Sequence, residues 1–109
     1  MKSRPSKYRN RRTVVDGITF DSAKEARRYS DLLLLQKHGE IADLQRQVRY
    51  ELIPKTDHFR AGHYVADFVY LDERTGKEVV EDCKGFRTPE YVWKKKMMYA
   101  VHGILIFES

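Results

Sequence analysis

Tyr64–Tyr70 (YVADFVY) decides the fold of this chain, because six of its seven residues are apolar or aromatic and the seventh, Asp67, is a carboxylate. The run predicts a strand, which we place at His63–Leu71. A turn at Asp72–Gly76 follows, so the next strand, Glu78–Lys84, is expected to pair antiparallel with it. Burying a charge is costly unless it is paired or metal-bound. The sequence therefore marks Asp67 as a candidate functional residue.

The segments upstream of these strands predict a hairpin, a helix and another strand. Asp16-Gly17 is the turn signal of a small hairpin over Thr13–Phe20. A helix is expected from Ser22, which forms an S-x-x-E capping box with Glu25, to a stop at Gly39. Val48–Ile53, ended by Pro54, is expected to be the first strand of the main sheet.

Downstream, the sequence predicts a second helix and a final strand. Thr88-Pro89 provides an N-cap and first turn for a helix to about His102. Ile104–Phe107 is fully apolar, which favours a strand at the centre of the sheet. The order is helix, three strands, helix, strand, and it predicts one α/β domain with a mixed sheet and flanking helices. The buried face of the second helix is expected to contain Trp93, Met97, Ala100 and Val101.

Length and composition exclude several classes. The 109 residues suit one domain, and 41% hydrophobic content suits a single core. Apolar runs such as Leu32–Leu35 are far shorter than the roughly 20 residues of a membrane span, and no apolar stretch follows the basic N-terminus, so neither a membrane protein nor a secretory signal is expected. The single cysteine, Cys83, excludes an internal disulfide and fits a reducing cytoplasm.

The positive charge is concentrated at the N-terminus. Residues 1–12 carry six basic residues and no acid, whereas the remaining chain, with a net charge of −1, is nearly neutral. Two interpretations stay open: a segment that contacts nucleic-acid phosphates, or a solvated tail. The first divides the chain into a basic arm, 1–12, and a domain, 13–109, and proposes as DNA-binding residues Arg4, Lys7, Arg9, Arg11 and Arg12.

The two central strands predict a cluster of charges. Side chains alternate along a strand, so Asp82 and Lys84 share one face while Glu81 and Cys83 share the other. The hairpin is expected to bring Asp67 beside Asp82. Two close carboxylates repel, and a divalent cation bound by both removes the conflict, with Mg²⁺ or Mn²⁺ favoured by oxygen ligands. The backbone carbonyl of Cys83 is a candidate third ligand.

Asp67, the Asp82-x-Lys84 pair and the upstream Glu25 resemble the PD-(D/E)XK nuclease superfamily, and from residue 13 to 109 the chain is similar to small phage and prophage proteins of unknown function. The resemblance implies a restriction-endonuclease-like fold and metal-dependent hydrolysis of DNA. In it Asp67 and Asp82 would bind metal, Lys84 would assist the attacking water, and Glu25 would complete the site. One departure is Ala66, which stands where the superfamily pattern often has proline.

Each candidate also has a purely structural interpretation. Glu25 would only complete the capping box, and Asp82 with Lys84 would form a plain ion pair. Glu81 is an alternative metal acid, although the strand pleat directs it away. A histidine site at His58 and His63 has no third ligand at useful spacing, and Gln47 is a weak candidate for a supporting role. The run Lys94, Lys95 and Lys96 is either a solvated helix face or a phosphate contact.

These features predict a Mg²⁺- or Mn²⁺-dependent endonuclease acting on duplex or branched DNA in a bacterial host cytoplasm. The resemblance also implies a phage origin, resolvase-like activity, and phage replication, recombination or packaging proteins as partners. Dimers occur among resolvase-like members, and the leucines of the first helix, Leu32–Leu35, offer an interface. The alternative function is a catalytically inactive nuclease fold that serves as a DNA-binding or adaptor protein.

Overall fold

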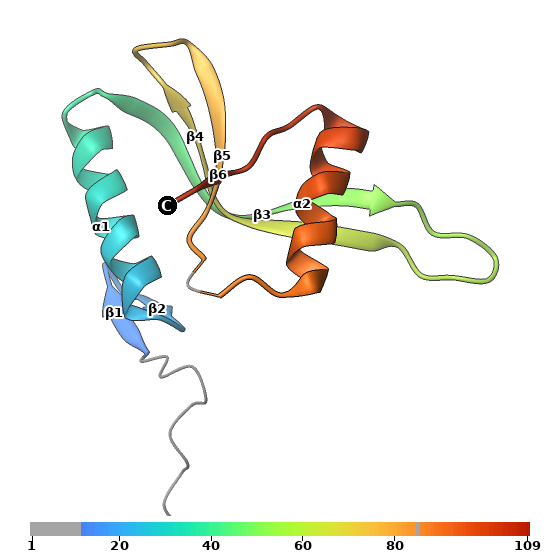
Figure 1. Ribbon diagram of the computed structural model, residues 1–109. Coiled ribbons are helices and arrows are strands. Elements are labelled where there is room, and N and C mark those ends of the chain that lie inside the picture. The colour runs from blue at the N-terminus through green and yellow to red at the C-terminus, as the bar shows by residue number, and fades with distance from the viewer. Residues whose placement is uncertain (1–11, 85) are drawn as a thin grey trace, which may run out of the picture.

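The computed structural model describes residues 12–84 and 86–109. Two hairpin strands come first, β1 (Thr13–Val15) and β2 (Ile18–Phe20), followed by helix α1 (Ala23–Lys37) (Figure 1). The main sheet contains β3 (Ile41–Ile53), β4 (Gly62–Asp72), β5 (Lys77–Asp82) and β6 (Phe107–Glu108), with helix α2 (Pro89–His102) between the last two. The chain is therefore a small α/β domain, as the sequence predicts.

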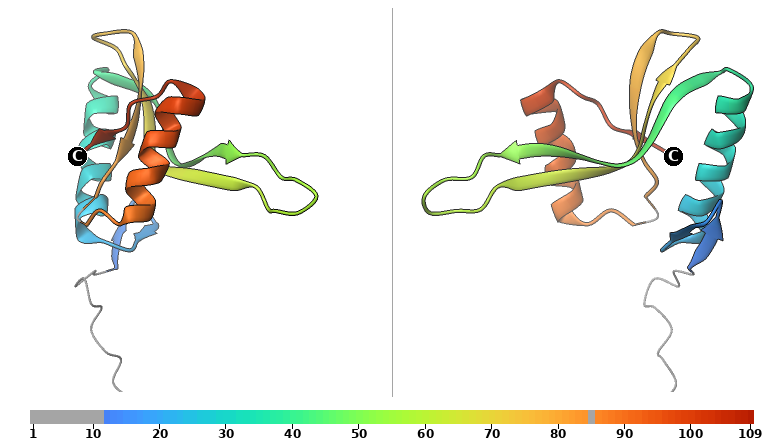
Figure 2. Two further views of the ribbon diagram at one scale, coloured as in Figure 1. Left: turned by 45° about the vertical axis from the view of Figure 1, so that its right-hand side comes forward. Right: turned by 180° about the vertical axis from the view of Figure 1, so that it is seen from behind.

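The sheet is mixed and has the order β3-β4-β5-β6. The first three strands pair antiparallel, and β6 lies parallel to β5. The helices cover opposite faces of the sheet (Figure 2). One core packs α1 and the hairpin against Phe68 and Tyr70. The other packs α2 against Tyr64, Ala66 and Val80.

Both predicted helix starts are confirmed. The Ser22 hydroxyl accepts a hydrogen bond from the Glu25 amide at 3.1 Å, and the Thr88 hydroxyl accepts one from the Tyr91 amide at 3.1 Å. These bonds satisfy amides that a helix leaves without an internal partner. They also fix where α1 and α2 begin relative to the sheet.

The predictions for two strands of the main sheet, the first and the last, are wrong. The first sheet strand begins at Ile41 and not at Val48, because the polar segment before Val48 pairs with β4 through a register shift near Asp43. The last strand is only Phe107–Glu108 and lies at the sheet edge. The apolar residues before it, Ile104 and Ile106, are covered by packing in the core under α2, so they need no strand partner.

The predicted buried face of α2 is also wrong. Trp93 is 67% exposed, Val101 is 51% exposed, and Ala100 is exposed. The helix instead buries Tyr91 and Met98, which lie two turns apart on one side, with Met97 partly buried beside them. Among the α1 leucines, Leu32 is fully buried and Leu33 and Leu35 pack partly against the same core, whereas Leu34 is 56% exposed; a dimer interface on this helix stays a prediction.

Near the middle of β3 and β4, the two strands rotate so that their side chains change from one face of the sheet to the other. In a regular strand residues two apart face the same side, yet Ala66 belongs to the core under α2 and Phe68 to the core under α1. On the neighbouring strand Gln47 has a left-handed backbone with φ of 52°. Beyond this bend the two strands form a β-arm, residues 48–66, whose first part packs under α2 and whose far end projects from the body (Figures 1 and 2). Asp67 therefore lies at the bend.

Candidate active site at the bend of the sheet

Asp67 is held by the backbone of one neighbouring strand and a side chain of the other. Its Oδ2 accepts a hydrogen bond from the Cys83 amide at 2.9 Å, just past the end of β5. Its Oδ1 lies 3.4 Å from Nε2 of Gln47, the β3 residue with the left-handed backbone. A strained backbone conformation of this kind is common at functional sites. The bend thus orients this carboxylate from both sides.

Asp82 is a fully buried carboxylate directly beside it. The Tyr64 hydroxyl donates a hydrogen bond to Asp82 Oδ2, and Lys84 Nζ lies 3.3 Å from Oδ1. That lysine contact lacks hydrogen-bond geometry, so Oδ1 is a buried acceptor with no hydrogen-bond donor among the described residues. Burial and then the neighbouring Asp67 raise the pKa of Asp82 to about 7.

The pKa of Asp67 is raised as well, chiefly by burial, and the charge and hydrogen-bonding influence of Glu25 push it in the same direction. Its bond from Cys83 and its interaction with Asp82 act against this rise. The structure therefore brings Glu25, from the first turn of α1, into the electrostatic environment of the carboxylate pair. A residue that only completed a capping box would not need to lie close to Asp67.

Lys84 completes the cluster from the segment after β5. Besides its contact with Asp82, its Nζ lies 4.9 Å from the centre of the Tyr91 ring. Its carbonyl accepts a hydrogen bond from Lys24 Nζ at 3.0 Å, which ties the start of α1 to this segment. The side chain keeps 32% of its surface exposed. A partly exposed positive group is thus fixed beside the buried Asp82.

The predicted alternation along β5 is confirmed, because Glu81 lies on the opposite face. Arg28 of α1 makes two hydrogen bonds to it, at 2.6 and 2.9 Å, and the Tyr70 hydroxyl donates a third at 2.6 Å. Burial alone would raise the pKa of Glu81, but the bonds from Arg28 and Tyr70 lower it. Glu81 is therefore a structural partner of Arg28 and Tyr70 and is not part of the candidate site.

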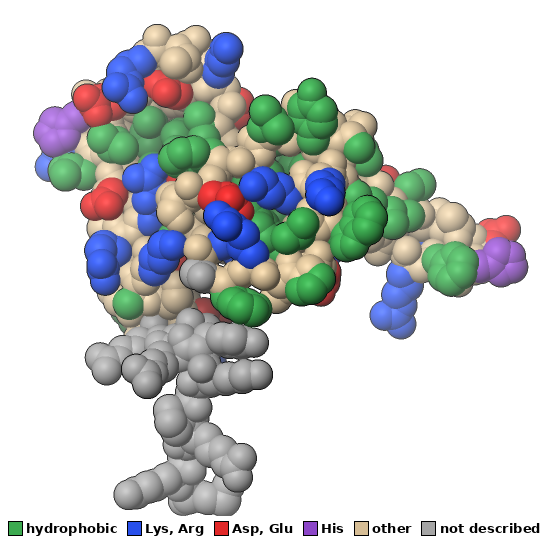
Figure 3. Space-filling view, in the orientation of Figure 1, with side chains coloured by type: hydrophobic (Ala, Val, Ile, Leu, Met, Phe, Trp, Pro, Cys, Tyr) green, Lys and Arg blue, Asp and Glu red, His purple; other side chains and the backbone are tan. Residues whose placement is uncertain are grey.

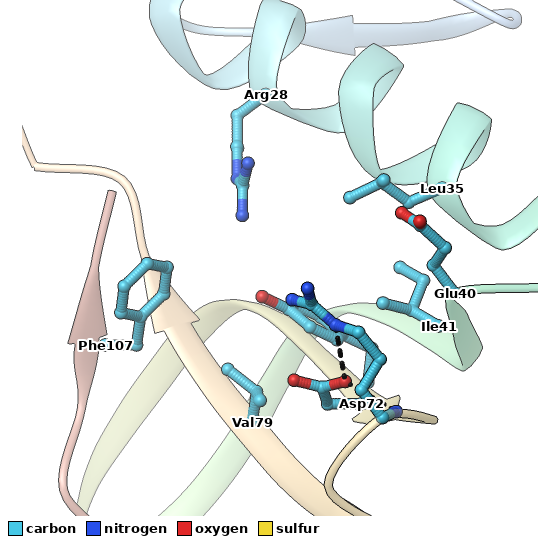
Figure 4. Close-up of a pocket in the computed structure, with 9 residues that line it drawn as sticks. Arg28, Leu35, Glu40, Ile41, Asp72, Val79 and Phe107 are labelled. Carbon is cyan, nitrogen blue, oxygen red and sulfur yellow. Dashed lines mark hydrogen bonds and ion pairs between the residues drawn. The ribbon is translucent and has the colours of Figure 1, made fainter.

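A hollow of about 290 Å³ lies on this second face, between α1 and the strand ends. Figure 4 shows Arg28 pointing toward it from α1, with Phe107 of β6 and Asp72 of β4 across from it. Arg74 at its rim pairs with Asp72 at 3.8 Å. The hollow contains neither Asp67 nor Asp82, so it is separate from the carboxylate pair.

The donor set at the bend fits a divalent cation in part. Two carboxylates with raised pKa values and an orphaned oxygen on Asp82 are the features that a bound cation would relieve. Across residues 12–84 and 86–109, no three acidic, histidine or cysteine side chains are arranged as a complete ligand set. Roles for Glu25 and the Cys83 carbonyl as further ligands therefore stay predictions.

The predicted DNA contacts fall into two groups. Arg4, Lys7, Arg9 and Arg11 lie outside the described residues, and Arg12 is exposed. On α2, Lys94 pairs with Glu90 at 3.1 Å, Lys95 pairs with Glu108 at 3.1 Å, and Lys96 Nζ lies 5.5 Å from the centre of the Trp93 ring. Figure 3 shows that lysine and arginine side chains gather over α1 and across the middle of one face.

Sequence reasoning missed Tyr64 as a site residue. It lies in the apolar run that defines β4, where a tyrosine is expected to be core. Its ring is in that core, but its hydroxyl donates to Asp82. The available signal was a tyrosine in an apolar strand that is expected to pair with the strand of Asp82, since a buried hydroxyl requires a partner.

The bend therefore defines a class: a small α/β domain whose mixed sheet brings together a buried carboxylate, Asp82, a half-buried one, Asp67, and a lysine. The chain belongs to the family described as protein of unknown function (DUF1064), whose model matches residues 5–104. No curated protein and no solved structure matches the chain. Within the described residues, no helix has the length and apolar character needed to cross a membrane.

Proposed function

We propose that this protein is a divalent-metal-dependent endonuclease acting on DNA. The observation that carries the proposal is the grouping of Asp67, Asp82 and Lys84 at the bend of the sheet, with both carboxylates raised in pKa. Raised carboxylate pKa values in one cluster are typical of functional sites. The spacing of these three residues is also the basis of the resemblance to PD-(D/E)XK nucleases.

In this proposal each residue has a distinct task. Asp67 and Asp82 would hold the cation, which would supply Lewis-acid polarisation of a phosphodiester. Glu25 adds negative charge at the same place. The Tyr64 hydroxyl and the Cys83 amide fix the orientation of the two carboxylates. Lys84 Nζ is the partly exposed positive group that orients the attacking water and offsets charge developing on the phosphate.

DNA is proposed as the substrate because its phosphate backbone would pair with the basic residues of this chain. Six basic residues lie in the first twelve of the sequence, and Lys84 and Lys24 flank the carboxylates. Contacts to phosphates position a protein without reading sequence. The proposal therefore expects cleavage that depends on DNA shape more than on a long recognition sequence.

A second candidate function is a nuclease-like fold that binds DNA or a protein partner without cutting. The observation that favours it is that Asp82 already has a hydroxyl on one oxygen and an ammonium near the other. In such a protein these two groups would be permanent structural partners of Asp82. Divalent cations would then have no effect on its behaviour.

The test is incubation of the full chain with linear, supercoiled and four-way-junction DNA in Mg²⁺, Mn²⁺ or EDTA. We expect cleavage in either metal and none in EDTA. Asp82→Asn should abolish cleavage while DNA binding in EDTA survives. Asp57→Asn, an exposed loop carboxylate on the β-arm, is the matched control and should cut at the wild-type rate. Binding without cleavage of any substrate would support the second candidate.

A further inference from the structure

Arg46 is a cation next to the candidate site that has no anionic partner in the described chain. Its buried Nε has no hydrogen-bond partner, and it forms no ion pair with any carboxylate of the described residues. Its guanidinium carbon lies 4.4 Å from the centre of the Phe20 ring and 5.6 Å from that of Tyr29. Within the described residues, the guanidinium is therefore held by its contacts with these two rings.

In this arrangement the guanidinium is fixed in position while its N–H donors can still bind an anion. Stacking on a ring restricts the side chain, and the ring face attracts the positive charge. It does not satisfy the N–H donors in the guanidinium plane. A buried donor without an acceptor costs free energy, so such groups are uncommon unless a ligand supplies the acceptor. The planar fork of arginine matches two oxygens of one phosphate.

The location connects Arg46 to the carboxylate pair. Arg46 is opposite Phe68 in the sheet register, and the next residues on the two strands are Gln47 and Asp67, which contact each other. Strand spacing places the Arg46 backbone about 6 Å from that of Asp67. Tyr29, which Arg46 approaches, lies one helical turn after Glu25 on α1. Arg46 thus lies on the α1 side of the site.

We infer that Arg46 binds a backbone phosphate of the DNA beside the phosphodiester held at Asp67 and Asp82. The inference rests on the proposed function for the identity of the anion, a phosphodiester. The aromatic support from Phe20 and Tyr29 keeps the guanidinium rigid, so the contact fixes the register of the strand relative to the carboxylates. Arg46 is a positioning residue and takes no part in bond breaking.

The test compares DNA binding by wild type, Arg46→Met and Arg74→Met in EDTA over a range of salt concentrations. Methionine keeps an apolar stem over Phe20 but removes the charge. We expect Arg46→Met to weaken binding about tenfold and to reduce the slope of log K against log salt by about 1. Arg74→Met should match wild type, because that side chain is 81% exposed at the β4–β5 turn, away from the bend. An unchanged slope for Arg46→Met would overturn the inference.

A second measurement uses the wild-type fold. The Nε–Hε signal of Arg46 in ¹H–¹⁵N spectra, assigned with Arg46→Lys, should shift on adding a short DNA duplex in EDTA. No shift at saturating DNA would overturn the inference even if Arg46→Met failed to fold. Neither experiment needs cleavage. If no metal supports cutting but the slope falls and the signal shifts, the nuclease proposal fails and the phosphate site stands. If cutting is metal-dependent and Arg46→Met binds like wild type, only this inference fails.

Discussion

Replacing Asp82 with asparagine should stabilise the metal-free protein at alkaline pH. The pKa of this carboxyl is about 7 in the folded chain against an ordinary value of 3.8, mainly because it is buried and next to Asp67. The folded state therefore binds more protons than the unfolded state between these values, and stability falls as pH rises through them. The resulting penalty on the folded state is about 2 kcal/mol at pH 5 and about 4 kcal/mol at pH 8.

Asparagine removes the titrating charge and still offers an oxygen to the Tyr64 hydroxyl. Relative to wild type, the gain in unfolding free energy should therefore be larger at pH 8 than at pH 5 by about 2 to 3 kcal/mol. Urea unfolding in EDTA at the two pH values measures this difference, and it cancels any pH-independent effect of the substitution. Equal effects at both pH values, or a loss of stability at pH 8, would refute the electrostatic description of the pair.

Three further predictions concern the surroundings of the site. Glu25→Gln should slow cleavage by orders of magnitude while stability changes by about 1 kcal/mol or less, because the bond from its amide to Ser22 remains; a near-normal rate would leave capping as its only role. Deleting residues 1–12 should reduce the slope of log K against log salt by about 2 to 3 on every DNA tested, which is roughly half of what six phosphate contacts would give. If the truncated and full-length proteins have equal slopes, this segment is a passive tail. Arg28→Met should cost about 3 kcal/mol in chemical unfolding, because Glu81 would stay buried with only the Tyr70 hydroxyl; a loss below 1 kcal/mol would contradict that.

Local signals in the sequence were sufficient for the parts of the fold that depend on local chemistry. The Asp16-Gly17 turn, the Ser22 and Thr88 caps and the alternation of Glu81 and Asp82 all follow from neighbouring residues. The end of the chain did not follow, because burial of Ile106 comes from packing under α2 and apolar content alone does not distinguish that from strand pairing.

The sequence was sufficient to predict the charged residues of the candidate site, but not the residues that surround them. Alternation along β5 indicates that Asp82 shares a face with Lys84, and the hairpin indicates that Asp67 is near. The contributions of Tyr64 and Arg46 depend on the strands turning over between Ala66 and Phe68. That turn accompanies the left-handed backbone of Gln47, a residue whose type carries little conformational signal. Long-range geometry of this kind is not encoded in residue spacing.

Calorimetric titration of the wild-type chain with Mn²⁺ in buffers of different ionisation enthalpy tests most directly whether the Asp67–Asp82 pair binds a divalent cation. Since the pKa of Asp82 is about 7, binding should release about one proton per chain at pH 6 and close to none at pH 8.5. Asp82→Asn should abolish both the binding and the proton release, whereas Asp57→Asn should retain them. Binding without proton release at pH 6, or unchanged binding by Asp82→Asn, would contradict the account.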